Sequence, residues 1–132
     1  MTRSDLSGRR VLIVEDRYLI ATEVADTVAD LGGEVLGPVS SVQAAAELLR
    51  QTRADLALLD VNLDGEMVFP LAEELERGGT PIVFLTGYNE ETLPAAWRGR
   101  PRLVKPVDPV ALRDVLLRAR ASGARPAAPD RV

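Results

Sequence analysis

Residues 56–65 read LALLDVNLDG, and this stretch decides the fold. Its first four residues, Leu56 to Leu59, are all apolar, lack helical spacing, and lie shortly before the turn pair Asp64-Gly65. Such a run predicts a strand that is buried on both faces, as strands are in parallel sheets. Ligands of open parallel α/β sheets bind beyond the carboxyl ends of the strands, so Asp60 is the first candidate for a functional residue.

The composition limits the chemistry that the chain can carry out. Its 132 residues suit one domain with a hydrophobic core. It has no cysteine and no histidine, which excludes disulfides, a thiol nucleophile, a Ser-His-Asp triad and histidine-ligated or thiolate-ligated metals. A net charge of -4 without a basic stripe argues against a nucleic-acid partner. No apolar run could span or anchor in a membrane, and residues 1–10 lack a signal peptide's apolar centre, so we expect a soluble cytoplasmic protein.

Strand and helix patterns alternate along the rest of the chain. Apolar runs predict four more strands, at residues 11–14, 34–39, 81–85 and 102–105. Apolar residues at helical spacing predict helices that follow Arg17, Ser40-Ser41, Asp64-Gly65 and Pro109, and one short helix within residues 88–100. Ser40 to Gln43 is typical of a capping box, and Asp108-Pro109 is a second helix start.

This alternation predicts an α/β fold of the flavodoxin-like (βα)5 type, a doubly wound five-stranded parallel sheet with strand order 2-1-3-4-5. The predicted folded domain covers residues 10–121, after an extension at residues 1–9. Residues 122–132 are rich in Ala, Pro and Arg without apolar periodicity, which predicts a disordered tail.

The predicted strand order brings several polar residues to one edge of the sheet. Glu15-Asp16 and Asp60 end the first and third strands, which are neighbours about 4.8 Å apart. A cation would relieve this crowding of carboxylates, and oxygen ligands favour a hard ion such as Mg²⁺. Thr86 ends the fourth strand, and Lys105, the only lysine of the chain, ends the fifth.

These residues together make the stretch from about Arg10 to Ala121 resemble the receiver domain of two-component response regulators. The resemblance implies that Asp60 accepts a phosphoryl group, that Thr86 senses it through its hydroxyl, and that Lys105 pairs with one of its oxygens. It further implies a Mg²⁺ site made by Glu15, Asp16, Asp60 and the backbone carbonyl of Asn62. Asp64 and Glu66 stay outside this set, because Asp64-Gly65 is explained by turn chemistry.

The segment PIVFLTGY, residues 81–88, is similar to the fingerprint of the FAT GUY subgroup of receivers, with departures at Ile82 and Leu85. The whole chain resembles a stand-alone receiver. The resemblance implies a sensor histidine kinase, of the HWE or a related family by the subgroup likeness, or a histidine phosphotransfer protein as partner. It implies a signalling switch and not a turnover enzyme.

Two other functions stay open at this point. One is a receiver-shaped interaction module that is never phosphorylated. The other is a haloacid-dehalogenase-like phosphatase, which also uses an aspartate nucleophile, Mg²⁺ and a lysine. Its signature needs a second aspartate two residues after the first, where this chain has Asn62, and it places the nucleophile on the first strand.

One position departs from the receiver pattern. In most receivers an aromatic residue three places before the lysine of strand five moves inward when the threonine engages the phosphoryl group. That residue is Arg102 here, and an unpaired guanidinium is costly to bury. We therefore expect Tyr88 and the loop through Leu93 to replace the aromatic as the element that phosphorylation shifts.

Overall fold

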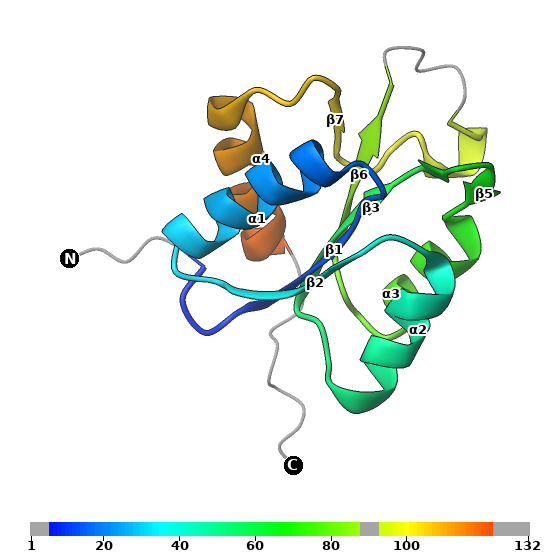
Figure 1. The fold of residues 1–132 in the computed structure, drawn as a ribbon, viewed down its shortest axis with the longest axis horizontal. Helices are drawn as coiled ribbons and strands as arrows, with labels where there is room; N and C mark the ends of the chain where they lie inside the picture. Colours follow the sequence, from blue (N-terminus) through cyan, green and yellow to red (C-terminus); the bar gives the residue numbers. More distant parts are fainter. Residues whose placement is uncertain (1–5, 88–92, 123–132) are drawn as a thin grey trace.

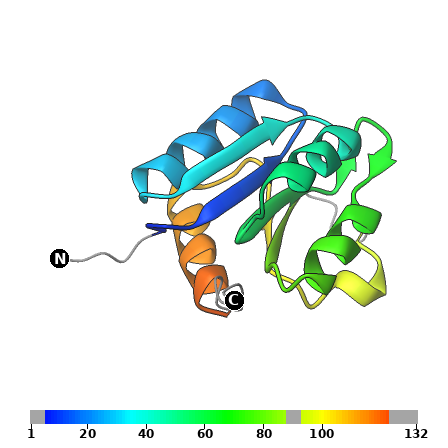
Figure 2. The same ribbon diagram turned by 90° about the horizontal axis from the view of Figure 1, so that it is seen from below.

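The computed structural model describes residues 6–87 and 93–122. It contains a sheet of five parallel strands, in the order β2-β1-β3-β6-β7, with helices packed on both faces (Figures 1 and 2). Numbered within this sheet alone, the order is 2-1-3-4-5, so the flavodoxin-like fold predicted from the sequence is confirmed. The strands are β1 (Arg10–Val14), β2 (Glu34–Val39), β3 (Leu56–Asp60), β6 (Ile82–Thr86) and β7 (Arg102–Val104).

Among the described residues, four α-helices and one short 3-10 helix accompany these strands. They are α1 (Tyr18–Asp30), α2 (Val42–Gln51), α3 (Phe69–Arg77), α4 (Pro109–Ser122) and the 3-10 helix η2 (Ala95–Trp97). α1 and α4 cover one face of the sheet, and α2 and α3 cover the other (Figure 2). In the described ranges, no helix combines the length and the apolar character that a membrane crossing needs.

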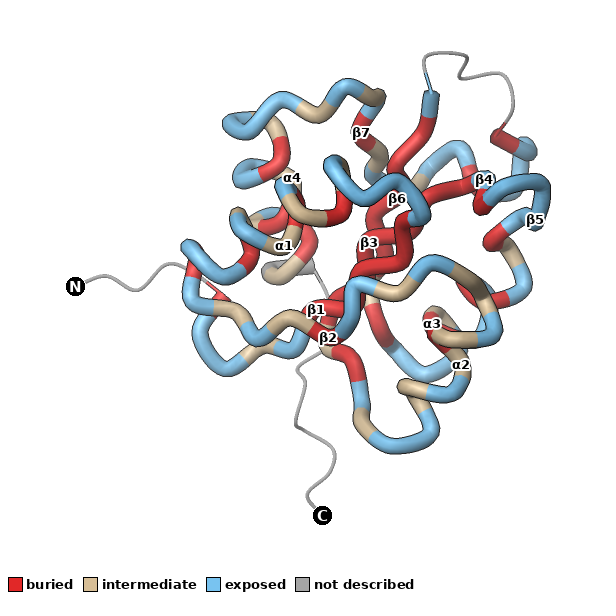
Figure 3. The backbone as a smooth tube through the Cα atoms, viewed as in Figure 1, coloured by how far each residue is buried: buried red, intermediate tan, exposed pale blue. Residues whose placement is uncertain are grey.

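The apolar run of residues 56–59 forms the centre of the core. All five residues of β3 are buried, as are all five of β6 (Figure 3). Because neighbouring residues of a strand point to opposite faces, Ala57 and Leu59 join the core under α2 and α3, while Leu56 and Leu58 join the core under α1 and α4. Leu6 is also fully buried, in the core under α1 and α4, so core packing includes a residue of the predicted extension at residues 1–9.

Helix starts are mostly where the sequence placed them. Asp108 accepts a hydrogen bond from the backbone N–H of Ala111 at 2.9 Å and so caps α4 as predicted. The predicted capping box at Ser40 to Gln43 is wrong by one residue. Ser41 is the N-cap of α2, and its hydroxyl accepts a hydrogen bond from Ala44 N–H at 3.0 Å, so Gln43 is not at the position that would close the box.

The structure adds a small hairpin that the sequence analysis treated only as a turn. Strands β4 (Asn62–Leu63) and β5 (Glu66–Met67) pair in antiparallel fashion around Asp64-Gly65. Both turn residues have positive φ, 54° for Asp64 and 98° for Gly65, which is the backbone that an Asp-Gly hairpin favours. The hairpin begins at Asn62 and so fixes the course of the backbone shortly after Asp60.

The predicted short helix within residues 88–100 is only the single 3-10 turn of η2 in the described part of that segment. Tyr88 and the neighbouring residues 89–92 lie outside the described residues, and so do residues 123–132 of the predicted tail.

Candidate phosphoacceptor site

Strand register places the candidate site at the carboxyl edge of the sheet. Val14 of β1 pairs with Leu59 of β3, so Glu15 follows beside Asp60. Asp60 in turn pairs with Leu85 of β6, and Thr86 is the next residue of that strand. The backbone N–H of Lys105 donates to the carbonyl of Thr86 at 2.8 Å, which fixes the end of β7 beside β6. Three strands and the residue after β7 therefore deliver the predicted residues to one place.

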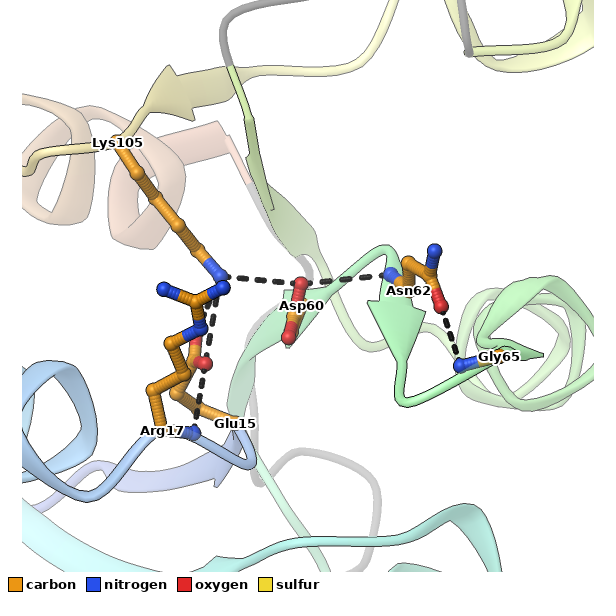
Figure 4. A network of polar contacts seen from close by, with 6 residues as sticks. All are labelled: Glu15, Arg17, Asp60, Asn62, Gly65 and Lys105. Atoms are coloured by element: carbon orange, nitrogen blue, oxygen red, sulfur yellow. Dashed lines mark hydrogen bonds and ion pairs between the residues drawn. The ribbon is translucent and has the colours of Figure 1, made fainter.

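Lys105 joins the two buried carboxylates. Its ammonium lies 3.2 Å from Oδ1 of Asp60 and 3.0 Å from Oε1 of Glu15 (Figure 4). Asp60 and Glu15 are buried, with exposed fractions of 4% and 2%. Two negative charges therefore share one positive charge in a place with little water, an arrangement that leaves the site short of positive charge.

The protonation of Asp60 reflects this shortage. Burial, and then the negative charge of Glu15, raise the pKa of Asp60 from 3.8 to about 7, although Lys105 and the N–H of Asn62 act in the opposite direction. The Asn62 N–H donates to Oδ1 of Asp60 at 3.3 Å. A carboxyl whose pKa is raised in this way will gain from any cation that enters the site.

A group of carboxylates that could hold a metal ion surrounds the same position. One carboxylate oxygen from each of Glu15, Asp16 and Asp60 lies within 4.8 Å of the other two, and Asp16 is exposed where the others are buried. Hard divalent cations such as Mg²⁺ prefer an all-oxygen set of this kind, and the raised pKa of Asp60 indicates that positive charge is missing. The residues present therefore fit a Mg²⁺ ion.

Asn62 and Thr86 complete the predicted set. The side chain of Asn62 faces away from the carboxylates, because its Oδ1 accepts a hydrogen bond from Gly65 N–H at 2.7 Å. Only its backbone remains for a role at the site. The hydroxyl of Thr86, a residue only 2% exposed, has no hydrogen-bond partner among the described residues, although it borders the same pocket as Asp60 and Lys105. A buried hydroxyl without a partner is expected where a ligand is still to come.

The pocket above the carboxylates has lining residues that the sequence analysis did not name. Arg17, Ile20 and Met67 contribute to its wall together with every predicted site residue except Glu15. The signal for Arg17 was its place directly after Glu15-Asp16. Arg102, at the position where most receivers have an aromatic, is partly exposed, and its guanidinium donates to the backbone carbonyl of Arg98 at 3.2 Å.

Comparison with known proteins assigns the chain to a family. Residues 11–117 match the response regulator receiver domain family. The chain therefore belongs to the receiver domains of response regulators, the signalling domains of two-component systems.

Among individual proteins, the chain is 30% identical over 109 residues to the transcriptional regulatory protein PdtaR of Mycobacterium tuberculosis, which covers 82% of this chain and 53% of PdtaR. The chain thus spans about half the length of this curated relative. The solution structure of SdrG from Sphingomonas melonis Fr1 has a TM-score of 0.77 at 34% identity, covering 92% of this chain and 99% of SdrG. The receiver domain of PhyR from Erythrobacter litoralis has a TM-score of 0.79 at 28% identity, covering 92% and 97%.

Proposed function

We propose that this receiver is switched by phosphorylation of Asp60, and that the donor is a phosphohistidine on a sensor histidine kinase or a histidine phosphotransfer protein. The observation that carries the proposal is the buried Asp60 carboxylate, 3.2 Å from Lys105 at the carboxyl edge of the sheet, with the unpartnered Thr86 hydroxyl bordering the same pocket. The likeness in sequence segment 81–88 favours a kinase of the HWE or a related family.

The chemistry requires only positioning and charge from the protein. A carboxylate oxygen of Asp60 attacks the phosphorus, the P–N bond to the imidazole breaks, and its electron pair remains on the imidazole nitrogen. Lys105 is placed to pair with one phosphoryl oxygen, and the Thr86 hydroxyl can donate to another. Because the phosphoryl group ends on the protein itself, we propose a signalling switch and not a turnover enzyme.

Asp16, Asp60 and the backbone carbonyl of Asn62 would hold Mg²⁺, with Glu15 acting through water. When bound, the ion supplies positive charge against the crowded oxygen atoms and orients them. Its support here is the close group of carboxylate oxygens. Lys105 takes no part in metal binding, because an ammonium cannot be a metal ligand.

The test uses acetyl phosphate, a small phosphodonor, with and without Mg²⁺, and reads the mass of the intact protein. We expect a phosphoryl adduct on the wild type that depends on Mg²⁺, no adduct on Asp60→Asn, and a normal adduct on Asp26→Asn, a matched change on the exposed side of α1. An unmodified wild type would favour the interaction module that is never phosphorylated. An adduct on Asp60→Asn equal to that of the wild type would overturn the site assignment.

A further inference from the structure

Arg17 stands between the acidic pair and the first helix, and its backbone is tied to the site. Its N–H donates to Oε2 of Glu15 at 3.0 Å, the same carboxylate that pairs with Lys105 (Figure 4). Its side chain lines the pocket that also contains Asp60 and Thr86. The position of Arg17 therefore depends on the site even though the residue is exposed.

The guanidinium of Arg17 has no ion pair with a carboxylate anywhere in residues 6–87 and 93–122. The neighbouring acids do not supply one, since Glu15 is taken by Lys105. By contrast, the Arg100 guanidinium is held by two hydrogen bonds to Glu76. Arg17 thus offers an unused planar set of donors at the pocket wall.

Helix stability does not explain an arginine at this position. Arg17 is the N-cap of α1, it makes no side-chain capping bond, and the first turn of the helix has no acidic residue. Ser, Thr, Asp and Asn are the residues that stabilise an N-cap, and a positive charge beside the positive end of the helix dipole is unfavourable. α2 and α4 follow the usual rule with Ser41 and Asp108, whereas α3 begins after Val68, an uncharged residue that also makes no capping bond. Arg17 therefore destabilises the start of α1, and its charge adds positive potential at the pocket.

The proposed acyl phosphate would use that potential. The phosphoryl dianion adds to the charges of Glu15 and Asp16, and Lys105 with one divalent cation does not fully balance them. A guanidinium can bind two phosphoryl oxygens at once, whereas an ammonium acts as a point charge. Metal ligation cannot be the role of Arg17, because a guanidinium has no lone pair to give.

We propose that Arg17 is a second cation that contacts the phosphoryl group on Asp60, from the α1 side of the pocket, in addition to Lys105. The inference rests on the proposed phosphorylation of Asp60. It assigns Arg17 two effects: tighter binding of anionic phosphodonors, and a longer life for the phosphoryl group, since contact with its oxygens hinders the approach of water.

The test measures the affinity for beryllofluoride, a stable mimic of the phosphoryl group, in the presence of Mg²⁺, by amide NMR titration. We expect Arg17→Ala to bind about fivefold more weakly than the wild type, because one exposed charge-assisted contact is lost. Arg17→Lys should fall between the two, since it keeps the charge and loses the planar donor set. Arg50→Ala removes an exposed arginine in the last turn of α2, outside the pocket, and should bind as the wild type does.

A second measurement separates this inference from the proposed function. The phosphoryl lifetime after labelling with acetyl phosphate should be shorter in Arg17→Ala. If the wild type takes no label and binds no beryllofluoride, the proposed function itself fails. If the wild type does both and Arg17→Ala matches it in affinity and lifetime, only the role of Arg17 is overturned. Slower transfer from a kinase with unchanged beryllofluoride affinity would also overturn it, by placing Arg17 in a protein contact.

Discussion

Two clusters of charge in this domain are built in opposite ways. At the candidate site, Lys105 serves two buried carboxylates, Glu15 and Asp60, with exposed Asp16 nearby. In the segments that lead into β6 and β7, Glu76 and Arg100 form a balanced pair through two hydrogen bonds of 2.7 and 2.8 Å, and the guanidinium lies over the ring of Trp97 at 4.9 Å. The first cluster has more negative than positive charges, whereas the charges of the second cluster are balanced.

The pKa values record this difference. The pKa of Asp60 is raised to about 7, mainly by burial, while the hydrogen bond from Arg100 lowers the pKa of Glu76. A structural cluster satisfies its own groups, whereas a binding site leaves the balance to its ligand. Removing groups from each cluster should therefore have opposite effects on stability.

The largest effect is expected where Arg100 meets the aromatic cluster. Trp97 packs against Phe69 and Phe84 with ring centroids 5.8 and 5.7 Å apart and is only 8% exposed. Trp97→Ala should lower the free energy of unfolding by about 3 kcal/mol, because it removes a large buried ring and leaves a cavity. Urea unfolding followed by circular dichroism measures the change. A loss below about 1 kcal/mol would show that the rings are not a unit of stability.

Replacement of Asp60 should instead raise the free energy of unfolding, in buffer without divalent cations and at a pH above its raised pKa. The native pKa of about 7 lies above the ordinary 3.8, so the folded protein holds more protons than the unfolded chain between these values. The contribution of Asp60 to the free energy of unfolding of the wild type is therefore highest below pH 4 and falls as the pH rises to about 7.

Asp60→Asn should remove that fall, and at pH 8 it should be more stable than the wild type by about 2 kcal/mol, roughly half the value that the full shift would give. Unfolding by urea at pH 4 and pH 8 measures it. Equal pH slopes in the two proteins would contradict the raised pKa.

A smaller effect is expected on the free energy of Mg²⁺ binding when Asp16 is replaced. Asp16→Ala should weaken Mg²⁺ binding about tenfold, since one of the few carboxylate ligands is lost. Asp64→Asn is the matched control, because Asp64 lines the same pocket and its φ of 54° is one that asparagine adopts readily. Calorimetry gives both affinities. If Asp64→Asn weakens binding as much as Asp16→Ala, the ligand set is wrong.

The sequence was most informative where a property is local. The run before Asp60 predicted its strand, and alternation of strands and helices predicted the strand order that brings Glu15 and Thr86 to Lys105. The Asp-Gly pair carried a hairpin signal, but strands of two residues are too short for a periodic pattern. The capping error at Ser40 was one residue, because either serine of the pair can cap.

Non-local features could not be read in this way. Trp97 sits in a segment without an apolar stripe, and it is held by rings that are 13 and 28 residues away in the chain, Phe84 and Phe69. Arg17 resembled an ordinary surface arginine until the pocket and the uncapped helix were visible. The charge balance of a cluster depends on which partners remain free, and only the folded structure gives that information.

The smallest effect is expected for the balanced pair itself. Glu76→Gln keeps the shape of the side chain and removes its charge, and both partners are about one-third exposed, at 30% for Glu76 and 36% for Arg100. Exposed pairs contribute roughly 0.2 to 1 kcal/mol, so we expect a loss of about 0.5 kcal/mol at pH 7 and low salt.

The pH dependence of this loss separates the pair from simple packing. The pKa of Glu76 is lowered in the folded protein, so its contribution is complete above the ordinary value of 4.5 and disappears as pH falls through the folded value. The difference between the wild type and Glu76→Gln should therefore vanish at acid pH and shrink in 1 M salt, where charges are screened within about 3 Å. Chemical unfolding at both pH values and both salt concentrations tests this. A difference that stays constant across all of them would mean that Glu76 holds Arg100 by shape and neutral hydrogen bonds, and the contrast in charge between the two clusters would then be lost.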